Sequence, residues 1–413
     1  MKKLLKVLLW IVIAVTVICA SLAVANKISE AAMIKYIDTF GAVEGGSTLV
    51  PEKDEFGNWY FTTDGEFKVL HLTDVHICGG VFTVGKDRKA MNAVAAMVSA
   101  EKPDLVVVTG DISFAIPTTG TLNNKYAHEY FKRLMENLGV YWTVTFGNHD
   151  SEKYNFHDRA AVAKMYSDES LERCLFSAGP ADVFGECNHV INVKNSQGLI
   201  TESLVMIDTN AYLDEDILGL GWKYDNVRES QVQWYKENIE RYSAYNKSVY
   251  DALPEETRPA DAERYTTVKS MMFMHIPIKE VKYAYDEYVN NGRQNTADVT
   301  FVTGNDGESD DVVYCPVEDE QLFETILELS STEALFYGHD HLNNFVMEYK
   351  GVTLCYGMSI DYSAYLGIDK KGYQRGCNVI TCAPDGSFEI SHQNYYQDKY
   401  QPLYEKESVD MSK

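Results

Sequence analysis

Five short blocks of the sequence place metal-ligand side chains directly after apolar, β-rich runs. The blocks are LTDVH, TGD, FGNHD, FMH and YGHDH, and their candidate ligands are Asp74, His76, Asp111, Asn148, His275, His339 and His341. A glycine precedes the polar side chain in three blocks, which permits a tight turn and a close backbone approach to a bound group. Two carboxylates, one amide and four imidazoles form a mixed oxygen and nitrogen set. Such a set suits Mn, Fe, Co, Ni or Zn better than Mg or Ca.

This ligand set is too large for one ion in an open catalytic site, so it divides naturally between two ions. Two metal ions ~3.5–4 Å apart can share a carboxylate and a hydroxide, an arrangement suited to displacement at phosphorus. Bound ions also create a local positive charge that attracts a phosphate, although the whole chain carries a net charge of −24. The expected partner is therefore a small phosphorylated substrate.

The composition argues against nucleic-acid binding through a basic face. The chain has 37 Lys and Arg against 61 Asp and Glu, and its basic residues do not cluster outside the N-terminus. The cysteines beyond Cys19 are odd in number and lack C-x-x-C spacing. This pattern favours buried free thiols over a disulfide framework, and one bridge between Cys174 and Cys187 is left open.

Residues 1–25 are predicted to be a signal peptide or an N-terminal membrane anchor. Three lysines precede an uncharged, mostly apolar run from Val7 to Ala25, whose length lies between those of a signal peptide's apolar segment and a full membrane span. An A-x-A cleavage pattern ends the run, and retention with the body outside the cell is equally compatible with the flanking lysines. Either interpretation exports the remainder, to the extracellular space or to the outer face of the cell membrane.

The rest of the chain alternates buried strands with amphipathic helices, which is typical of an α/β domain. Strands are predicted at 67–76, 103–111, 140–150 and 268–278, two β runs within 189–208, and helices at 87–102, 126–138, 227–242 and 318–331. Other segments are a surface excursion at 243–266, a mobile loop at 291–311 and short β segments at 345–392. We expect a linker and lead-in strand at 26–65, one domain at 66–400 and a polar tail at 401–413. Strands separated by helices imply a parallel sheet, so the polar blocks should meet at its carboxyl edge.

The ordered series of blocks resembles the calcineurin-like metallophosphoesterase superfamily, whose signature is D-x-H, G-D, G-N-H-D/E, a lone His and G-H-x-H. All five elements occur in this order across residues 74–341. The segments TFGNHD, MHIPI and YGHDHLNNF are most similar to the branch related to purple acid phosphatases. The resemblance implies a four-layer α/β/β/α sandwich. It also implies hydrolysis of phosphate monoesters by a metal-bridging hydroxide.

The resemblance further implies a role for each ligand. Asp74, His76 and His341 would bind the first metal ion. Asn148, His275 and His339 would bind the second, and Asp111 would bridge the two. His149 would protonate the leaving oxygen or stabilise the transition state, and Asp150 would orient its ring.

One departure from the purple acid phosphatase pattern affects the expected metals. Purple acid phosphatases carry D-x-G and a tyrosinate on ferric iron, whereas this chain has His76 and Phe114 at those positions. We therefore expect a colourless metal pair, with an imidazole in place of the phenolate ligand.

Each polar residue taken alone has a simpler explanation. Asp74, His76 and Asp111 are compatible with strand-end turns, and Asp150 with a helix N-cap. Together these roles would leave charged and imidazole groups at buried strand ends without partners, which costs free energy. The clustered set therefore favours a metal centre.

Two alternative functions remain open at this point. One is a phosphodiesterase acting on nucleotides or lipid headgroups, because ligands alone do not separate monoesterases from diesterases. The other is a non-catalytic cell-surface binding protein on the same fold. Among further side chains, His71 is predicted to be a satisfied core histidine, Tyr362 and Tyr365 to pack or to line a substrate pocket, and Arg375 to lie at the surface.

Overall fold

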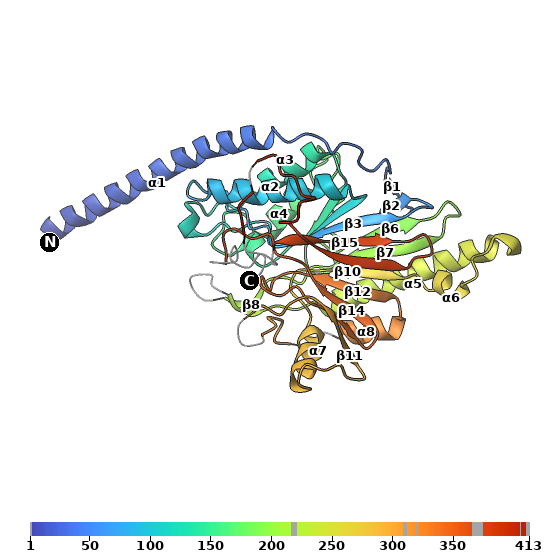
Figure 1. The fold of residues 1–413 in the computed structure, drawn as a ribbon. Helices are drawn as coiled ribbons and strands as arrows, with labels where there is room; N and C mark the ends of the chain where they lie inside the picture. Colours follow the sequence, from blue (N-terminus) through green and yellow to red (C-terminus); the bar gives the residue numbers. More distant parts are fainter. Residues whose placement is uncertain are drawn as a thin grey trace.

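The centre of the molecule consists of two β-sheets packed face to face (Figure 1). The computed structural model describes residues 2–215, 221–308, 312–318, 321–365, 375–404 and 406–409. The smaller sheet has the order β16-β15-β3-β4-β5, with β3 Phe67–Leu72, β4 Leu105–Thr109, β5 Trp142–Thr145, β15 Gly376–Cys382 and β16 Phe388–Asn394. Strands β3, β4 and β5 are parallel, with Leu70 opposite Val106 and Val106 opposite Trp142.

The larger sheet has the order β1-β2-β6-β7-β10-β12-β14-β13-β11. Its strands are β1 Glu52–Lys53, β2 Trp59–Thr62, β6 His189–Lys194, β7 Ile200–Met206, β10 Ser270–Phe273, β11 Val299–Thr303, β12 Thr332–Tyr337, β13 Val346–Tyr349 and β14 Val352–Tyr356. Within this sheet, the four consecutive strands β7, β10, β12 and β14 are parallel to one another. A separate hairpin pairs β8 Tyr212–Glu215 with β9 Gly221–Tyr224.

The strands carry apolar side chains on both faces because both faces are covered. In β4, Leu105 and Val107 pack between the two sheets, whereas Val106 and Val108 pack under helices. In β12, Phe336 lies between the sheets and Leu335 faces the other helical layer. Three apolar clusters therefore separate four layers.

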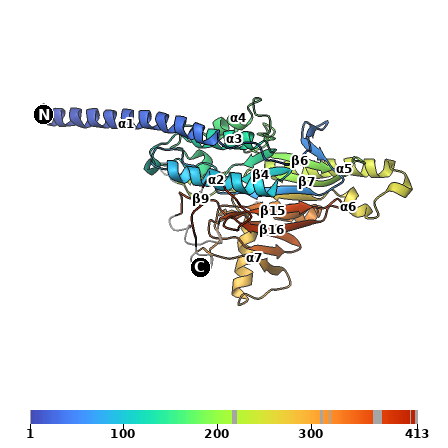
Figure 2. The same cartoon turned by 45° about the horizontal axis from the view of Figure 1, so that its top comes forward.

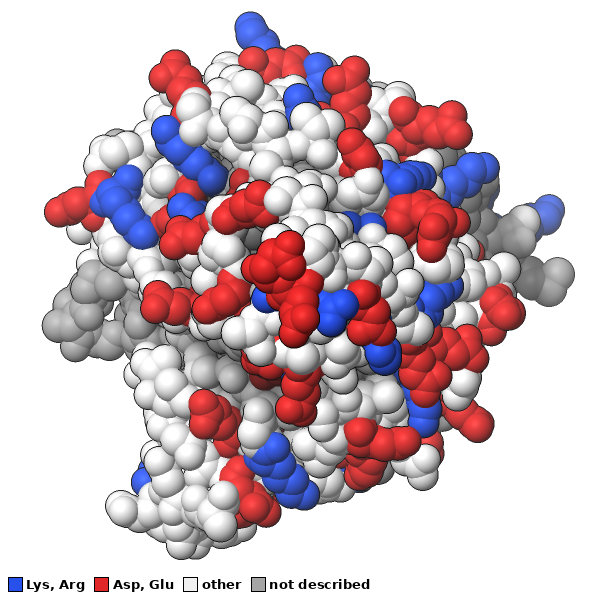
Figure 3. Space-filling view, turned by 90° about the vertical axis from the view of Figure 1, so that its right-hand side faces the viewer, with Lys and Arg blue, Asp and Glu red and all other residues white. Residues whose placement is uncertain are grey.

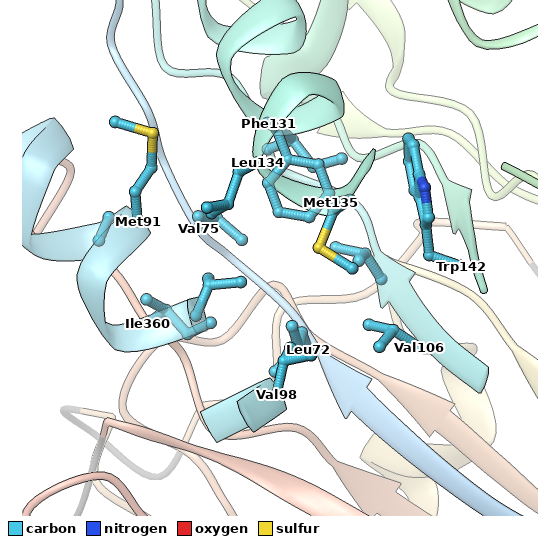
Figure 4. Packing of buried hydrophobic residues seen from close by; sticks show 14 of the residues in the cluster. Leu72, Val75, Met91, Val98, Val106, Phe131, Leu134, Met135, Trp142 and Ile360 are labelled. Atoms are coloured by element: carbon cyan, nitrogen blue, oxygen red, sulfur yellow. The ribbon is translucent and has the colours of Figure 1, made fainter. Parts of the chain in front are cut away.

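Helices cover the outer face of each sheet. Helices α2 (Val84–Glu101) and α3 (Lys125–Leu138) pack on the smaller sheet, where their side chains meet those of β3, β4 and β5 (Figure 4). The outer face of the larger sheet is covered by α5 (Glu229–Ala252), α7 (Lys279–Asn290) and α8 (Leu322–Leu329). Shorter helices are α4 (Arg159–Tyr166), α6 (Ala262–Thr266) and the 3-10 turns Pro117–Thr119, His149–Ser151 and Glu255–Thr257. The predicted α/β/β/α sandwich is confirmed.

Helix α1 (Lys2–Ile37) projects from the body of the molecule (Figures 1 and 2). An 18-residue window within it has a mean hydropathy of 2.9 and is not buried, so the helix is long and apolar enough to cross a membrane. Its second part contacts the domain: the Asn26 amide donates to the Gly120 carbonyl and accepts the Val81 N–H, and Tyr36 and Ile37 are buried. The helix thus continues past the predicted leader boundary without interruption.

Several predicted elements differ from the structure. The mobile loop predicted at 291–311 contains strand β11, an edge strand with a weak pattern because only its first residue is buried. Residues 309–311 of the predicted loop lie outside the described residues. Helix α7 was not predicted, although Val281, Ala284 and Tyr285 are buried at helical spacing. Helix α5 continues to Ala252, into the predicted surface excursion.

The charges on one face of the molecule and the state of the cysteines are consistent with the composition. Acidic and basic side chains are interspersed over the face shown in Figure 3, which has no large basic patch. All eight cysteines are free, so the open bridge between Cys174 and Cys187 does not form.

Candidate metal centre

The polar blocks follow five parallel strands that belong to both sheets. Asp74 and His76 follow β3, Asp111 follows β4, and the Asn148 block follows β5, all in the smaller sheet. His275 follows β10 and the pair His339 and His341 follows β12, both in the larger sheet. The carboxyl ends of strands from both sheets of the predicted sandwich therefore meet at one place.

Three glycines let these strand ends approach each other. A Cβ on Gly338 would lie 1.9 Å from Thr73 Oγ1, and one on Gly147 would lie 2.0 Å from Asp111 Oδ1. A Cβ on Gly110 would lie 2.4 Å from the Gly147 nitrogen, and Gly110 also has a φ of +75°. Any side chain at these positions would push the candidate ligands apart. The glycines predicted to permit close approach do so.

Four of the candidate ligands adopt the left-handed backbone conformation. The φ angles are 51° for Asp74, 49° for His76, 51° for Asp111 and 76° for His339. Each such residue costs roughly 1–3 kcal/mol and persists only where the surroundings enforce it, a pattern concentrated at functional sites. Strain at four residues of one cluster is therefore an observation in favour of a binding site.

The ligand atoms form two groups that share Asp111. Asp74, His76, Asp111 and His341 each offer one atom within 4.8 Å of the others, and so do Asp111, His275 and His339. Asp111 Oδ2 lies 3.3 Å from His76 Nε2 and 3.2 Å from His275 Nε2. The Nε2 atom of His341 lies 3.4 Å from Asp74 Oδ1. One carboxylate thus stands between two imidazole sets.

Among the described residues, several side chains of this cluster keep the atom that could bind a metal free of hydrogen bonds. His275 Nδ1 donates to the Thr109 carbonyl at 2.7 Å, which leaves the Nε2 lone pair for a metal ion. In the part of the chain that the structure describes, the following buried atoms have no hydrogen-bond partner: Asp74 Oδ1, Asn148 Oδ1, His275 Nε2 and His339 Nε2. Buried polar atoms without partners are costly, and a pair of cations would satisfy all four. The residues present therefore fit a metal pair.

The Asn148 side chain is held by its amide nitrogen. Its Nδ2 donates to the Tyr212 hydroxyl at 2.8 Å, which fixes the orientation of the partnerless Oδ1. The next residue, His149, donates its backbone N–H to Asp111 Oδ1 at 2.8 Å. The block after β5 is therefore tied to the shared carboxylate.

The protonation behaviour of the cluster reflects its opposed charges. Burial by itself would raise the pKa of Asp74, but the close contact of its Oδ1 with His341 and the charges of His341 and His275 lower this pKa to about 2. Burial by itself would lower the pKa of His76, but the carboxylates of Asp361 and Asp111 raise it to about 9. Protons on these imidazoles compete with a metal ion for the same atoms, so metal binding releases them.

The structure adds Asp361, a buried carboxylate that the sequence motifs did not indicate. Its Oδ1 lies 3.3 Å from His76 Nδ1, and its Oδ2 lies 3.5 Å from His341 Nδ1. Contact of a carboxylate with Nδ1 orients the ring and turns Nε2 toward a metal. Asp361 follows β14 and lies outside all five sequence blocks. The only signal for it in the sequence is the presence of a carboxylate in the GMSIDY segment.

Asp361 is held by its own loop and by Arg375. It accepts the backbone N–H groups of Ser363, Ala364 and Tyr365, and its carbonyl accepts Arg375 Nη2 at 2.6 Å. Arg375 is only 2% exposed and stacks on the Tyr362 ring, with 3.5 Å between its guanidinium carbon and the ring centroid. The predicted surface position of Arg375 is therefore wrong, because this arginine is buried and donates a hydrogen bond to the backbone of Asp361.

His149 and Asp150 are both present at the centre, but they do not pair. His149 Nδ1 lies 2.7 Å from Glu152 Oε1, so Glu152 orients the ring. Asp150 instead accepts the backbone N–H groups of Asp111, Ser113 and Gly147. The predicted partner of His149 is thus corrected, since Asp150 uses both oxygens to join the loops after β4 and β5.

A cavity of about 290 Å³ opens on this centre. Its lining residues are Asp111, Phe114, His149, Tyr224, Glu308, Tyr314, His339, His341, Ala364 and Tyr365. Tyr365 therefore lines the cavity, as the pocket alternative for it proposed, whereas Tyr362 packs against Arg375. His71 is a buried core histidine bonded to Thr109 Oγ1 at 2.7 Å, as predicted.

Comparisons with known proteins identify the family of this chain. The sequence model of the calcineurin-like phosphoesterase family matches residues 67–343. The chain is 26% identical to "Probable inactive purple acid phosphatase 14" of Arabidopsis thaliana, covering 78% of this chain and 76% of that protein. "Probable inactive purple acid phosphatase 29" of the same plant is also 26% identical, with 78% and 77% covered.

Two further comparisons extend this set. The chain is 24% identical to "Phosphatase DCR2" of Saccharomyces cerevisiae over 72% of its own length, and it spans about half of that longer protein, 48%. Among solved structures, a dimetal phosphatase from Danio rerio aligns with 12% identity and a TM-score of 0.44, over 80% of this chain and 97% of that one. Because the family model matches more than half of the chain and spans all five blocks, the chain belongs to the calcineurin-like phosphoesterase family.

Proposed function

We propose that this chain is a dinuclear-metal-dependent phosphoesterase that hydrolyses phosphate monoesters. The observation that carries the proposal is the position of Asp111, whose Oδ2 lies 3.3 Å from His76 Nε2 and 3.2 Å from His275 Nε2. A carboxylate shared by two ligand groups is the arrangement that a pair of adjacent ions requires.

The two groups, together with the partnerless Asn148 Oδ1, support one assignment of ligands to each ion. Asp74, His76 and His341 would bind the first, and Asn148, His275 and His339 the second, with Asp111 between them. The mixed oxygen and nitrogen donors suit Mn, Fe, Co, Ni or Zn. When bound, such a pair neutralises phosphate oxygens and makes water a nucleophile at neutral pH.

The chain's own groups complete the reaction. His149 lines the cavity beside Asp111, and Glu152 orients its ring through Nδ1. This arrangement leaves His149 Nε2 to deliver a proton to the leaving oxygen. Phe114 packs against the His149 ring with centroids 5.0 Å apart, which limits the positions that the ring can take.

The names of the plant relatives make a non-catalytic protein the alternative of another class. They are described as inactive, so family membership does not establish hydrolysis here. This chain retains a complete set of seven candidate ligands together with His149. That complete set favours an enzyme over a binding protein on a degenerate scaffold.

The test uses the full-length chain, purified in detergent, stripped of metal by a chelator and reloaded with Mn, Zn or Fe. We expect about two metal ions per chain and faster hydrolysis of p-nitrophenyl phosphate than of bis(p-nitrophenyl) phosphate. The reverse order would favour the phosphodiesterase alternative.

Two variants sharpen this test. Asp111→Asn should lose at least ~100-fold in kcat/KM, because it removes the charge shared by the two ions. Asp251→Asn is the matched control, since Asp251 lies on the exposed face of α5, paired with Lys247. Full metal loading without hydrolysis of either ester would assign the chain to the binding-protein class.

We also propose that α1 anchors the protein on the outer face of the cell membrane. Its apolar part is exposed, whereas Asn26 and the residues after it pack on the domain, so the helix joins the membrane and the domain as one rigid element. Intact mass of the membrane-extracted protein should include residues 1–25. A mass that begins at Asn26 would instead establish cleavage of a signal peptide.

A further inference from the structure

The walls of the cavity beside the metal centre consist largely of aromatic rings. Phe114, Tyr224, Tyr314 and Tyr365 line it together with the candidate ligands, and Glu308 is the one further charged residue among them. Within the described part of the chain, its lining includes no lysine or arginine. The proposed metal pair would supply the positive charge that holds a phosphate, so these side chains are left to contact the remainder of a substrate.

The rings stand directly against the imidazoles of the centre. The Tyr224 ring lies 4.3 Å from the His339 ring at 90°, and the Tyr365 ring lies 5.3 Å from the His341 ring at 65°. Phe114 meets His149 at 88°. The aromatic residues are therefore placed to surround the part of a substrate that extends outward from a phosphate held at the metals.

Glu308 places a carboxylate in the same wall. The residue is 8% exposed, its Oε1 accepts the Leu342 N–H at 2.9 Å, and its Oε2 accepts the Tyr365 hydroxyl at 2.9 Å. Among the described residues, no basic side chain forms an ion pair with it. A carboxylate beside a phosphate site repels an anionic substrate unless the substrate itself brings a positive charge.

We propose that this aromatic cavity binds a positively charged alcohol group, so that the preferred substrates are phosphate esters of amino or quaternary ammonium alcohols. The proposal deepens the proposed phosphoesterase function and rests on it for the reaction. Aromatic ring faces attract ammonium groups, and quaternary ammonium ligands are recognised by cages of such rings. Glu308 adds a charge of the opposite sign. Hydrolysis would add water across the P–O bond, releasing the ammonium alcohol and inorganic phosphate.

The cavity volume favours a small alcohol. At about 290 Å³ it lies near the lower limit of small-molecule sites, which run from ~300 to ~1,000 Å³. A nucleobase could also stack on aromatic rings and donate an N–H to Glu308, but a neutral base brings no positive charge to offset the carboxylate. The carboxylate therefore distinguishes a cationic alcohol from a nucleoside.

The first experiment measures binding without catalysis. Choline and its neutral isostere 3,3-dimethylbutan-1-ol are titrated calorimetrically into the full-length, metal-stripped chain in detergent. We expect choline to bind at least about tenfold more tightly, because only choline carries the charge. Equal affinities of the two alcohols would overturn the proposal, whether or not the chain hydrolyses phosphate esters.

The second experiment compares substrates on the metal-loaded chain. Choline phosphate should exceed 3,3-dimethylbutyl phosphate in kcat/KM by about tenfold or more. Glycerophosphocholine, a diester that carries the same choline group, is assayed beside choline phosphate. The faster of the two shows whether the cation comes from a free phosphate monoester or from a lipid-type headgroup. A nucleoside monophosphate that exceeds all of these esters would refute the cationic alcohol.

Variants assign the preference to the cavity. Glu308→Gln removes the charge and should reduce the ratio of choline phosphate to its neutral isostere about tenfold. Tyr365→Leu removes a ring, and Tyr365→Phe keeps it, so the first should reduce the ratio further than the second. Tyr283→Leu is the matched control, because Tyr283 is exposed on α7 and does not line the cavity. An unchanged ratio in both Glu308→Gln and Tyr365→Leu would contradict the proposal.

Discussion

Replacing Asp361 by asparagine tests how the first metal site is built. The carboxylate lies 3.3 Å from His76 Nδ1 and 3.5 Å from His341 Nδ1, and it is fully buried. Asparagine keeps the size of the side chain but removes the charge from both contacts. Each charge-assisted contact exceeds a neutral one by ~1 kcal/mol, so two contacts amount to ~2 kcal/mol.

This free energy predicts about a 30-fold loss in affinity for the first metal ion. The value falls within the ~10- to 100-fold range typical of carboxylates that orient ligating histidines. The ion held by His275 and His339 should keep its affinity, because neither ring contacts Asp361. The two affinities are measured by competition with a chromophoric chelator.

A matched control separates this effect from a general loss of structure. Asp104→Asn changes another carboxylate that accepts a backbone N–H, from Lys68 at 2.7 Å, but at the opposite end of β4 from the centre. It should leave both affinities unchanged. If Asp361→Asn is folded and binds both ions within about threefold of the unmodified chain, Asp361 does not position the ligands.

Further predictions concern packing, pH and colour. Gly338→Ala would place its Cβ 1.9 Å from Thr73 Oγ1 and should lower the unfolding free energy by more than ~2 kcal/mol. Gly85→Ala is the control, because a Cβ at Gly85 would have nothing within 4 Å and should not destabilise the fold. Thermal unfolding of the two variants measures the difference. Burial raises the pKa of Glu202 well above its ordinary 4.5, and in the described structure neither of its carboxylate oxygens has a hydrogen-bond partner. The folded chain therefore retains a proton that the unfolded chain releases, so the stability that Glu202 contributes falls as pH rises from 4.5 toward the raised pKa. Glu202→Gln should gain stability relative to the unmodified chain across that window, and a constant difference in denaturant midpoints would contradict this. Finally, iron-loaded protein should show no tyrosinate charge-transfer absorption, since Phe114 is 5.2 Å from the His76 ring where a phenolate would be required; a visible band would refute this.

The sequence was sufficient to predict the fold class because its strongest elements are fully buried. The run from Leu105 to Thr109 is buried throughout, and its apolar residues continue on both faces as expected for a covered strand. Edge and surface elements were predicted less well. Strand β11 is short and only its first residue is buried, so its local pattern is weak. Helix α7 has an apolar stripe at helical spacing, with Val281, Ala284 and Tyr285 buried, so this helix was overlooked although a signal was present.

The candidate metal ligands and their order along the chain were predicted from the sequence alone. In each block a glycine or a polar residue directly follows an apolar run, which indicates the carboxyl end of a buried strand. In α/β sheets, functional side chains gather at these ends. The types of side chain also predicted a mixed oxygen and nitrogen donor set. These are local properties, because they depend on a few consecutive residues.

Only the tertiary structure decided which side chains meet around those ligands. The close approach of β3, β4 and β5 to β10 and β12 depends on the packing of two sheets, which no short segment encodes. Asp361 reaches His76 from a loop after β14, and Glu152 replaces Asp150 beside His149 because Asp150 is occupied by backbone donors. Contacts between residues far apart in the chain are set by how layers pack, so the sequence determined the donors and the fold determined their partners.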